Sequence, residues 1–174
     1  MELINQQGNG LELVTICPGA VLGPVTGPDR SASIHIVGRL LDGSLPGLAR
    51  FGWPLVDVRD IADLHLRAMT APNAAGQRYI GAGPFAWMDD IAQVLRDRMP
   101  ALDSRVPRRS LPNALVRLSG LFDPAVRGRL YELGKHRSVS ADKAHSELGW
   151  TPRSNDDAIV ATAESLTRAG VITF

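Results

Sequence analysis

The sequence contains a single cysteine, Cys17, among 174 residues. One cysteine excludes an internal disulfide and any zinc site built from several cysteines. Because Cys17 ends a short apolar stretch, we expect it to lie in the core rather than to act as a nucleophile. None of the four histidines is spaced from another as paired metal ligands are, so the sequence predicts no metal site.

The chain also lacks an excess of charge of either sign. Nineteen Lys and Arg residues against eighteen Asp and Glu give a net charge of +1, which argues against non-specific binding to nucleic acid and against a polybasic membrane anchor. No apolar run is long enough to span a bilayer, and the polar first residues lack the apolar core of a signal peptide. We therefore expect a cytoplasmic protein with no nucleic-acid or membrane partner.

Aromatic residues are scarce at 5%, whereas 44% of the residues are apolar and 21% are charged. This composition is typical of a globular protein whose core is built mainly from aliphatic side chains. The length predicts one domain, or slightly more than one.

Apolar periodicity predicts an α/β chain. Residues 11–17 form the strongest strand candidate, with apolar residues on both faces, as in a parallel sheet that helices cover on both sides. Weaker strands are expected near 53–58 and 77–80. Helices are expected over 31–41 with Ser31 as N-cap, 60–70 with Asp60 as N-cap, 87–99, from Ser140 to Gly149, and after Asp156 or Asp157, with short helices in the basic, proline-broken region 104–137. Residues 1–7 read as the end of a helix.

These strands are too few for a parallel sheet covered on both sides, because such a strand needs neighbours along its edges. The sheet is therefore expected to be incomplete. Either another chain supplies the missing strands, or this chain is the C-terminal part of a larger protein.

Residues 81–86 (GAGPFA) fit the dinucleotide fingerprint G-x-G-x-x-[GA]. Asp89 and Asp90 at the start of the following helix would repel a pyrophosphate, and Pro84 removes an N–H donor from the loop. We favour an ordinary strand-to-helix turn here.

Tyr131 and Lys135 have the Tyr-x-x-x-Lys spacing of short-chain dehydrogenases, in which the lysine lowers the pKa of a proton-donating phenol. The spacing works only when both side chains lie on one face of a continuous helix. Gly134 lies between the two residues, so we expect a helix end instead.

Two charged groups have similar alternatives. The cluster of Asp57, Arg59, Asp60 and Asp63 is either an acid/base site or, as we favour, a helix N-terminus with acidic residues near its positive end. Arg105, Arg108, Arg109 and Arg117 are either a phosphate-binding group or, as we favour, a solvated surface.

Four segments in this order resemble the extended short-chain dehydrogenase/reductases (the NAD-dependent epimerase/dehydratase family), and within them the dihydroflavonol-4-reductase-like enzymes. Residues 13–24 (LVTICPGAVLGP) resemble the family's Pro-x-x-Val-x-Gly-Pro signature, and 56–62 (VDVRDIA) its Val-Asp-Val-Arg-Asp-Val-Ala segment. Residues 76–80 (GQRYI) are similar to its Gly-x-Arg-Tyr strand, and 143–152 (KAHSELGWTP) to its C-terminal Leu-Gly-Trp/Phe-x-Pro turn.

The resemblance implies the fold of the family's C-terminal half: an α/β fold with the C-terminal part of a Rossmann-type doubly wound parallel sheet plus a small, mostly helical substrate-binding region. Residues 1–174 would form a single partial domain. Within it, 1–30 would hold the last Rossmann strand and the nicotinamide-edge loop, and 31–174 the substrate-binding region interleaved with the remaining sheet elements.

The resemblance also implies a cofactor, NADP or NAD. Backbone groups at Pro18, Gly19, Ala20 and Val21 would contact the nicotinamide carboxamide, because a Pro-Gly turn leaves them outside any β-ladder at the carboxyl ends of the strands. Ser31 would lie near the cofactor or the substrate. The substrate wall would come from 31–53 and 104–133.

Family members carry the Gly-rich loop, the catalytic Ser/Thr and the Tyr-x-x-x-Lys in the half that precedes the position matched by Met1. We therefore expect no catalytic residue in this chain, and no activity from it alone. The implied function is the C-terminal portion of an NAD(P)H-dependent reductase of small-molecule carbonyls, with a complementary N-terminal half or a second copy as partner. The alternatives are a sugar-nucleotide epimerase or dehydratase portion, which an arginine clamp at 105–117 would favour, and a non-catalytic chain, either a truncated product or an interaction module.

Overall fold

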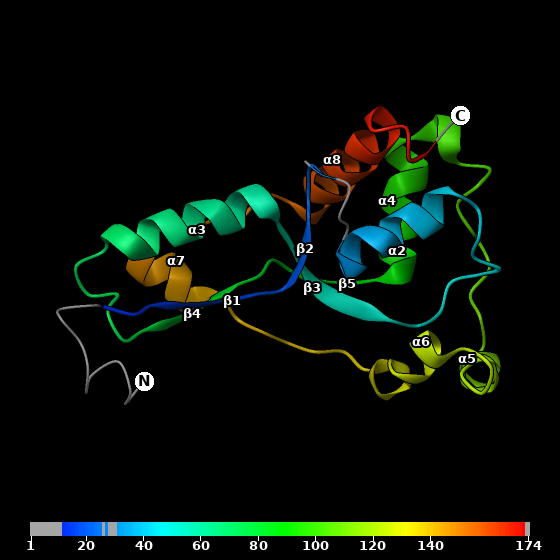
Figure 1. The fold of residues 1–174 in the computed structure, drawn as a ribbon, viewed down its shortest axis with the longest axis horizontal. Helices are drawn as coiled ribbons and strands as arrows, with labels where there is room; N and C mark the ends of the chain where they lie inside the picture. The colour runs from blue at the N-terminus through cyan, green and yellow to red at the C-terminus, as the bar shows by residue number, and fades with distance from the viewer. Residues whose placement is uncertain (1–11, 26, 28–30, 173–174) are drawn as a thin grey trace.

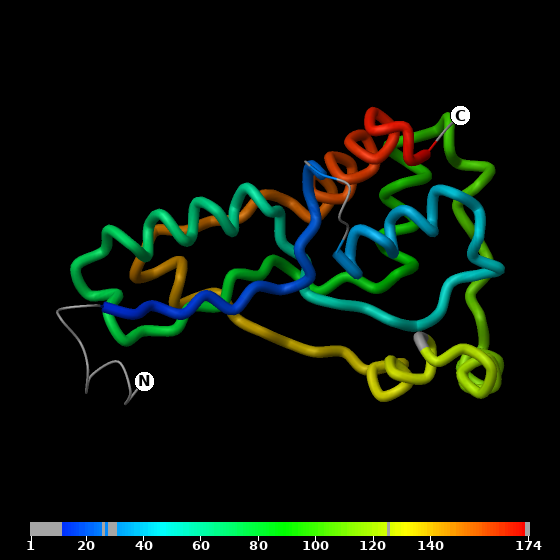
Figure 2. The backbone as a smooth tube through the Cα atoms, viewed as in Figure 1, coloured from blue at the N-terminus to red at the C-terminus, as the bar shows by residue number. Residues whose placement is uncertain are grey.

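The computed structural model describes residues 12–25, 27 and 31–172. The predicted helix over 1–7 and the first residue of the predicted strand 11–17 lie outside the described residues. The chain folds around two hydrophobic cores, each with its own small β-sheet and helices, which lie side by side along the long axis of the molecule (Figures 1 and 2).

The first core lies under a parallel pair of strands. β1 (Thr15–Pro18) pairs with β4 (Arg78–Gly81), and α3 (Val58–Thr70) and α7 (Asp142–Leu148) pack on this pair. The core consists of the buried residues Val56, Leu64, Ala68, Ala74, Tyr79, Ala144, Leu148 and Trp150. β1 is only half-buried, and among the described residues it pairs with β4 alone. The prediction of a strand covered on both sides is therefore wrong for β1 within this chain.

The second and larger core lies between a three-stranded sheet and three helices. β3 (Gly52–Asp57) is central, with β2 (Ala20–Leu22) parallel on one side and β5 (Phe85–Trp87) antiparallel on the other. α2 (Ala32–Leu41), α4 (Met88–Arg98) and α8 (Asn155–Arg168) pack against one another and this sheet. Between α4 and α7 come two short helices, α5 (Asn113–Ser119) and α6 (Pro124–Arg127), and the 3₁₀ turns Pro100–Leu102 and Leu130–Glu132.

Gly19 lies where the chain passes from one sheet to the other. Its N–H donates to the carbonyl of Gly81 at 3.0 Å, and one residue later β2 begins to pair with β3. A Cβ at position 19 would lie 2.5 Å from the carbonyl oxygen of Pro54. This close approach of two backbones explains why a residue without a side chain stands at the crossover.

The α/β class and the helices confirm the sequence prediction, with four local corrections. α7 begins at Asp142, and Ala141 rather than Ser140 stands at its N-cap position. β5 replaces the simple turn predicted before α4. α3 begins at Val58 with Asp57, not Asp60, as its N-cap, because the Asp57 carboxylate accepts from the Arg59 amide. α8 is capped by Ser154. No helix in the described ranges is both long and apolar enough to cross a bilayer.

Candidate functional site

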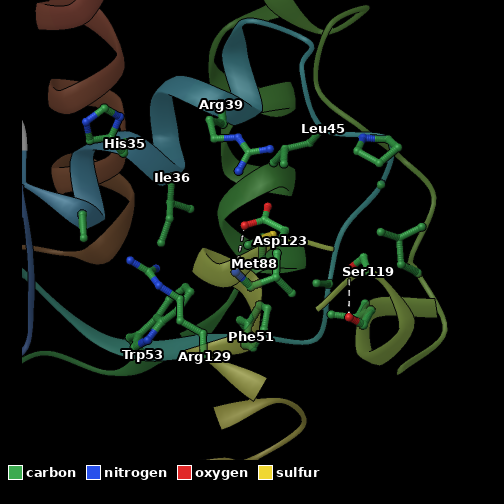
Figure 3. Close-up of a pocket in the computed structure, with 17 residues that line it drawn as sticks. His35, Ile36, Arg39, Leu45, Phe51, Trp53, Met88, Ser119, Asp123 and Arg129 are labelled. Atoms are coloured by element: carbon green, nitrogen blue, oxygen red, sulfur yellow. Dashed lines mark hydrogen bonds between the residues drawn. The ribbon is translucent and has the colours of Figure 1, made fainter. Parts of the chain in front are cut away.

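A cavity of about 470 Å³ opens between α2, β3 and the α5–α6 region. α2 contributes Ala32, His35, Ile36 and Arg39, which recur at helical spacing along one face. The remaining lining residues come from the segment after α2 and β3, from the start of α4, and from 111–129: Leu45, Pro46, Gly47, Ala49, Phe51, Trp53, Met88, Leu111, Val116, Ser119, Asp123, Val126 and Arg129. The structure thus brings the two predicted segments, 31–53 and 104–133, to opposite sides of one cavity (Figure 3).

Aromatic side chains line the β3 side of this pocket. The rings of Phe51 and Trp53 stack with centroids 6.2 Å apart. The indole N–H of Trp53 donates to Glu132 at 3.2 Å, which satisfies the polar atom of Trp53 and ties β3 to the segment after α6. The walls are therefore suited to a flat, apolar ligand.

Charged groups from two walls accompany this apolar lining. Arg39 reaches toward the pocket from α2, and Arg129 rises from the opposite side near Trp53 (Figure 3). Arg39 makes a long contact of 3.5 Å with Ser44. Sequence reasoning missed both arginines. The sequence did contain a periodicity that could have identified Arg39. It recurs at helical spacing with Ala32, His35 and Ile36, on a face of α2 next to the buried one.

Most backbone N–H and C=O groups at the predicted cofactor residues form hydrogen bonds within the chain. The prediction that the backbone groups after Pro18 lie outside any β-ladder is therefore wrong for most of them. Gly19 donates to Gly81, and Ala20, Val21 and Leu22 form β2. Val21 differs from its neighbours. Its carbonyl accepts from Ser33 Oγ, on the side of β2 away from β3. The N–H of a strand residue projects to the same side as its carbonyl, so the Val21 amide also points away from β3.

Ser31 is the N-cap of α2, as predicted, and accepts from the amide of Ile34 at 3.5 Å. Its hydroxyl also lies 2.9 Å from that of Ser33. The first turn of α2 is thereby linked to Val21, and the same helix continues as a wall of the pocket. The edge of β2 and the pocket are therefore positioned by one element.

The loop after β2 is held by α8. The amide of Gly23 donates to Thr162 Oγ1 at 2.7 Å, and the amide of Val25 donates to Ser165 Oγ at 2.9 Å. Both hydroxyl-bearing residues are buried. These two bonds fix the direction in which the chain leaves β2.

The acidic cluster at the start of α3 consists of ion pairs, in agreement with a helix N-terminus. Asp57 accepts from the backbone amide and the guanidinium of Arg59 at 2.7–2.8 Å. Burial raises the pKa of Asp57, but these hydrogen bonds outweigh burial and hold the pKa below 3.8. Asp60 pairs with Arg153, and Asp63 with Arg67. Since each of the three carboxylates is paired, the acid/base alternative loses its support.

The two rejected motifs have structural roles. In 81–86, the Gly83 amide donates to the Leu55 carbonyl at 2.6 Å, and β5 begins before any helix, so these residues do not form a phosphate loop. Tyr131 lies in a 3₁₀ turn, and Gly134 follows at φ 76°. Tyr131 and Lys135 therefore do not share a helix face, as predicted.

The remaining candidates lie outside the pocket. Arg105, Arg108, Arg109 and Arg117 do not line it, and Arg108 pairs with Asp103 at 2.6 Å. Cys17 is partly buried at the end of β1. Among the described residues, no group of three or more His, Cys, Asp or Glu side chains is arranged to hold a metal ion.

Comparison with known proteins gives curated relatives along part of the chain. A ketoreductase of Aspergillus niger is 33% identical over 124 residues, which cover 66% of this chain and 36% of the relative. Cinnamoyl-CoA reductase 1 of Arabidopsis thaliana is 35% identical over 91 residues, covering 52% and 26%, and dihydroflavonol 4-reductase of Zea mays is 32% identical over 102 residues, covering 58% and 28%. The chain is related to the extended short-chain dehydrogenase/reductases. No protein-family model matches the chain.

Solved structures of reductases and epimerases share the fold. The yeast methylglyoxal/isovaleraldehyde reductase Gre2, complexed with NADPH, superposes with a TM-score of 0.70 at 21% identity, covering 97% of this chain and 48% of the reductase. A nucleoside-diphosphate-sugar epimerase from Pseudomonas aeruginosa superposes with a TM-score of 0.72 at 22% identity, covering 99% and 53%. The chain therefore spans about half the length of these two solved structures.

Proposed function

We propose that this chain forms the substrate wall and the nicotinamide edge of an NAD(P)H-dependent carbonyl reductase, and that it corresponds to the C-terminal portion of such an enzyme. The observation that carries the proposal is the double role of α2. Its first turn is bonded to Val21 at the edge of β2, and its next turns line the apolar pocket. A carbonyl compound in the pocket would thus lie near the strand edge at which the family resemblance expects the nicotinamide.

The residues of this chain would bind and orient rather than transfer protons. Phe51, Trp53 and Met88 would cover an apolar substrate and exclude water from it. The Val21 amide is the donor that could bind the carboxamide of the cofactor. When bound, the nicotinamide would supply the hydride, and the proton donor would come from a complementary N-terminal half. The names of the relatives, a ketoreductase and reductases of cinnamoyl-CoA and dihydroflavonol, support a carbonyl substrate.

An epimerase or dehydratase portion is the less favoured function. The sign expected for it was an arginine clamp at 105–117, and those arginines do not line the pocket. Reconstitution with an N-terminal half distinguishes the reductase portion from the non-catalytic alternative.

The test is reconstitution. The chain alone should show no tight binding of NADPH in a calorimetric titration and no oxidation of NADPH with a panel of aldehydes and ketones. Mixing it with a separately produced N-terminal Rossmann half should give oxidation that depends on both parts. Absence of any association between the halves would contradict the proposal and favour the non-catalytic alternative.

A matched pair of variants sharpens this test. Ser33→Ala removes the hydroxyl that bonds Val21, so the reconstituted rate should fall several-fold. Ser146→Ala removes a hydroxyl from α7. Among the described residues this hydroxyl bonds only the Lys143 carbonyl, at 3.3 Å, and it does not line the pocket, so the rate should not change. Equal rates for the two variants would contradict the role assigned to α2.

A further inference from the structure

The charge balance of the whole chain conceals a strongly basic segment. Residues 104–137 contain eight Lys and Arg residues but only Asp123 and Glu132 as acids, a net charge of +6 in a chain whose total is +1. The rest of the chain is therefore net acidic. Glu132 is engaged by Trp53 and lies 3.7 Å from Arg137, and Asp123 is the other acidic residue of the segment.

The same segment exposes large apolar side chains. Leu115 and Leu118 on α5 are 51% and 54% exposed, and Leu121 and Phe122 in the following turn are 66% and 84% exposed. Leu115 and Leu118 are three positions apart and so lie on one face of the helix. Val116 faces the other way and is buried in the pocket wall. The helix thus has one apolar face that covers the pocket and another that is open to solvent.

The fold presents this second apolar face outward. α5 and α6 lie at one end of the molecule, on the far side of β3 from α8 (Figure 1). The turn that carries Leu121 and Phe122 is held in shape by Arg127, which donates to the carbonyls of Gly120 and Leu121 at 3.0 and 3.1 Å. Arg117 lies beside Leu118 on the exposed surface of α5, and no carboxylate in the described ranges forms an ion pair with it.

We propose that Leu115, Leu118, Leu121 and Phe122, together with Arg117 and the net positive charge of this segment, form a surface that docks on an anionic lipid membrane. Apolar side chains that protrude from a basic helical surface enter the boundary between headgroups and acyl chains, while each nearby Lys or Arg adds about 1 kcal/mol of attraction to anionic headgroups. This proposal reverses the inference from net charge that no membrane is a partner. It does not depend on the proposed reductase function.

A lipid surface fits these residues better than an acidic protein does. The four side chains project from a helix and a turn, and they line no groove among the described pockets. A protein partner must match such a protruding surface in shape, whereas the fluid interface of a bilayer accommodates it without a preformed complement. Val116 and Ser119 of the same helix line the pocket, so docking would bring the pocket close to the bilayer.

Co-sedimentation with vesicles tests the proposal. The full chain should bind vesicles of phosphatidylcholine mixed with phosphatidylserine, should bind pure phosphatidylcholine vesicles much more weakly, and should be released by added salt. The double variant Leu118→Ser, Phe122→Ser should bind the anionic vesicles about tenfold less tightly or worse, because two apolar side chains no longer enter the interface.

The matched control removes equally exposed apolar side chains elsewhere. Leu66 and Met69 on α3 are 64% and 75% exposed, and the charges on that helix are mixed. The double variant Leu66→Ser, Met69→Ser should bind anionic vesicles as the unchanged chain does. Circular dichroism should show that both double variants remain folded.

Three results would overturn the proposal. The first is no binding to either kind of vesicle. The second is equal loss in the two double variants, which would mean that general surface hydrophobicity drives the binding. The third is a dimer of the unchanged chain, detected by sedimentation velocity, that dissociates in the Leu118→Ser, Phe122→Ser variant, with no binding of the unchanged chain to vesicles. This third result would assign the surface to self-association instead.

Discussion

The indole N–H of Trp150 donates a hydrogen bond of 2.8 Å to the backbone carbonyl of Asp60, ninety positions earlier in the chain. The Asp60 carboxylate in turn accepts from the backbone amide of Arg153 at 2.8 Å and pairs with its guanidinium. Trp150 is 1% exposed. Two of the segments that carry the family resemblance, 56–62 and 143–152, therefore meet directly. Together they hold the first turn of α3 against the chain that follows α7.

This contact predicts a graded loss of stability at position 150. Trp150→Phe keeps an aromatic ring but leaves the buried Asp60 carbonyl without its donor, which should cost about 1–3 kcal/mol of the free energy of unfolding. Trp150→Ala also leaves a large cavity and should cost about 3–5 kcal/mol. Urea unfolding followed by circular dichroism measures both. If Trp150→Phe unfolds at the same urea concentration as the unchanged chain, the hydrogen bond is not stabilising.

Asp57 predicts a specific acid sensitivity. Burial alone would raise its pKa. The hydrogen bonds from Arg59 lower the pKa by more than burial raises it, so the folded-state pKa lies below 3.8. The carboxylate's contribution to the free energy of unfolding is therefore complete above pH 3.8 and is lost as the pH falls through the folded-state pKa. Asp57→Asn should lower the free energy of unfolding by about 1–3 kcal/mol at neutral pH. It should also make the free energy of unfolding less dependent on pH in the acid range.

The control for Asp57 is Asp63→Asn. Asp63 pairs with Arg67 on the exposed face of α3, with 45% of its side chain accessible. Such an i,i+4 pair is worth only about 0.3–0.5 kcal/mol, so this variant should keep nearly the full acid sensitivity. Urea midpoints measured from neutral pH down to pH 2–3 compare the two variants. An unchanged acid limb in Asp57→Asn would show that other carboxylates control it.

Local sequence signals were sufficient for the elements whose stability is local. The apolar stripe of Met88, Ile91 and Leu95 predicted α4, and Ser31 predicted the start of α2. Both predictions succeeded because periodicity and capping depend on residues only a few positions apart. β5 was missed because three residues carry little periodicity and its partner is β3. The N-cap of α3 was misplaced because either Asp57 or Asp60 can fill that role. In the structure Asp57 accepts from the Arg59 amide and caps α3, whereas the Asp60 carboxylate pairs with Arg153.

The candidate site was predictable only in outline. The segments that form its walls followed from the family resemblance, but the placement of Arg39 and Arg129 on two walls of one pocket depends on how α2 faces the region after α6. The backbone argument at Gly19 failed for a related reason. A Pro-Gly pair read from sequence suggests a strand end, whereas contact with Pro54 turns it into a crossover between two sheets.

The crossover at Gly19 predicts that an alanine substitution there lowers stability far more than one at Gly27. Gly19→Ala would place a Cβ 2.5 Å from the Pro54 carbonyl oxygen, so the two backbones must separate, at a cost of about 1–3 kcal/mol. A Cβ at position 27 meets no atom of the described residues within 4 Å, so Gly27→Ala should leave stability unchanged within about 0.5 kcal/mol. Thermal unfolding of the two variants side by side makes the comparison. Equal melting temperatures would mean that Gly19 is not under steric constraint.

The pocket predicts that its volume can be removed without unfolding the chain. Ala49 lines the cavity of about 470 Å³, and a phenyl ring at this position would occupy part of that space. Ala49→Phe should therefore abolish the binding of a small aromatic carbonyl such as cinnamaldehyde, measured by calorimetric titration, while the free energy of unfolding changes by less than about 1.5 kcal/mol. Ala62→Phe adds the same ring on the exposed face of α3, away from the pocket, and should bind the aldehyde as the unchanged chain does. Binding that survives in Ala49→Phe would place the carbonyl site elsewhere, because a ligand that needs this cavity cannot share it with a phenyl ring.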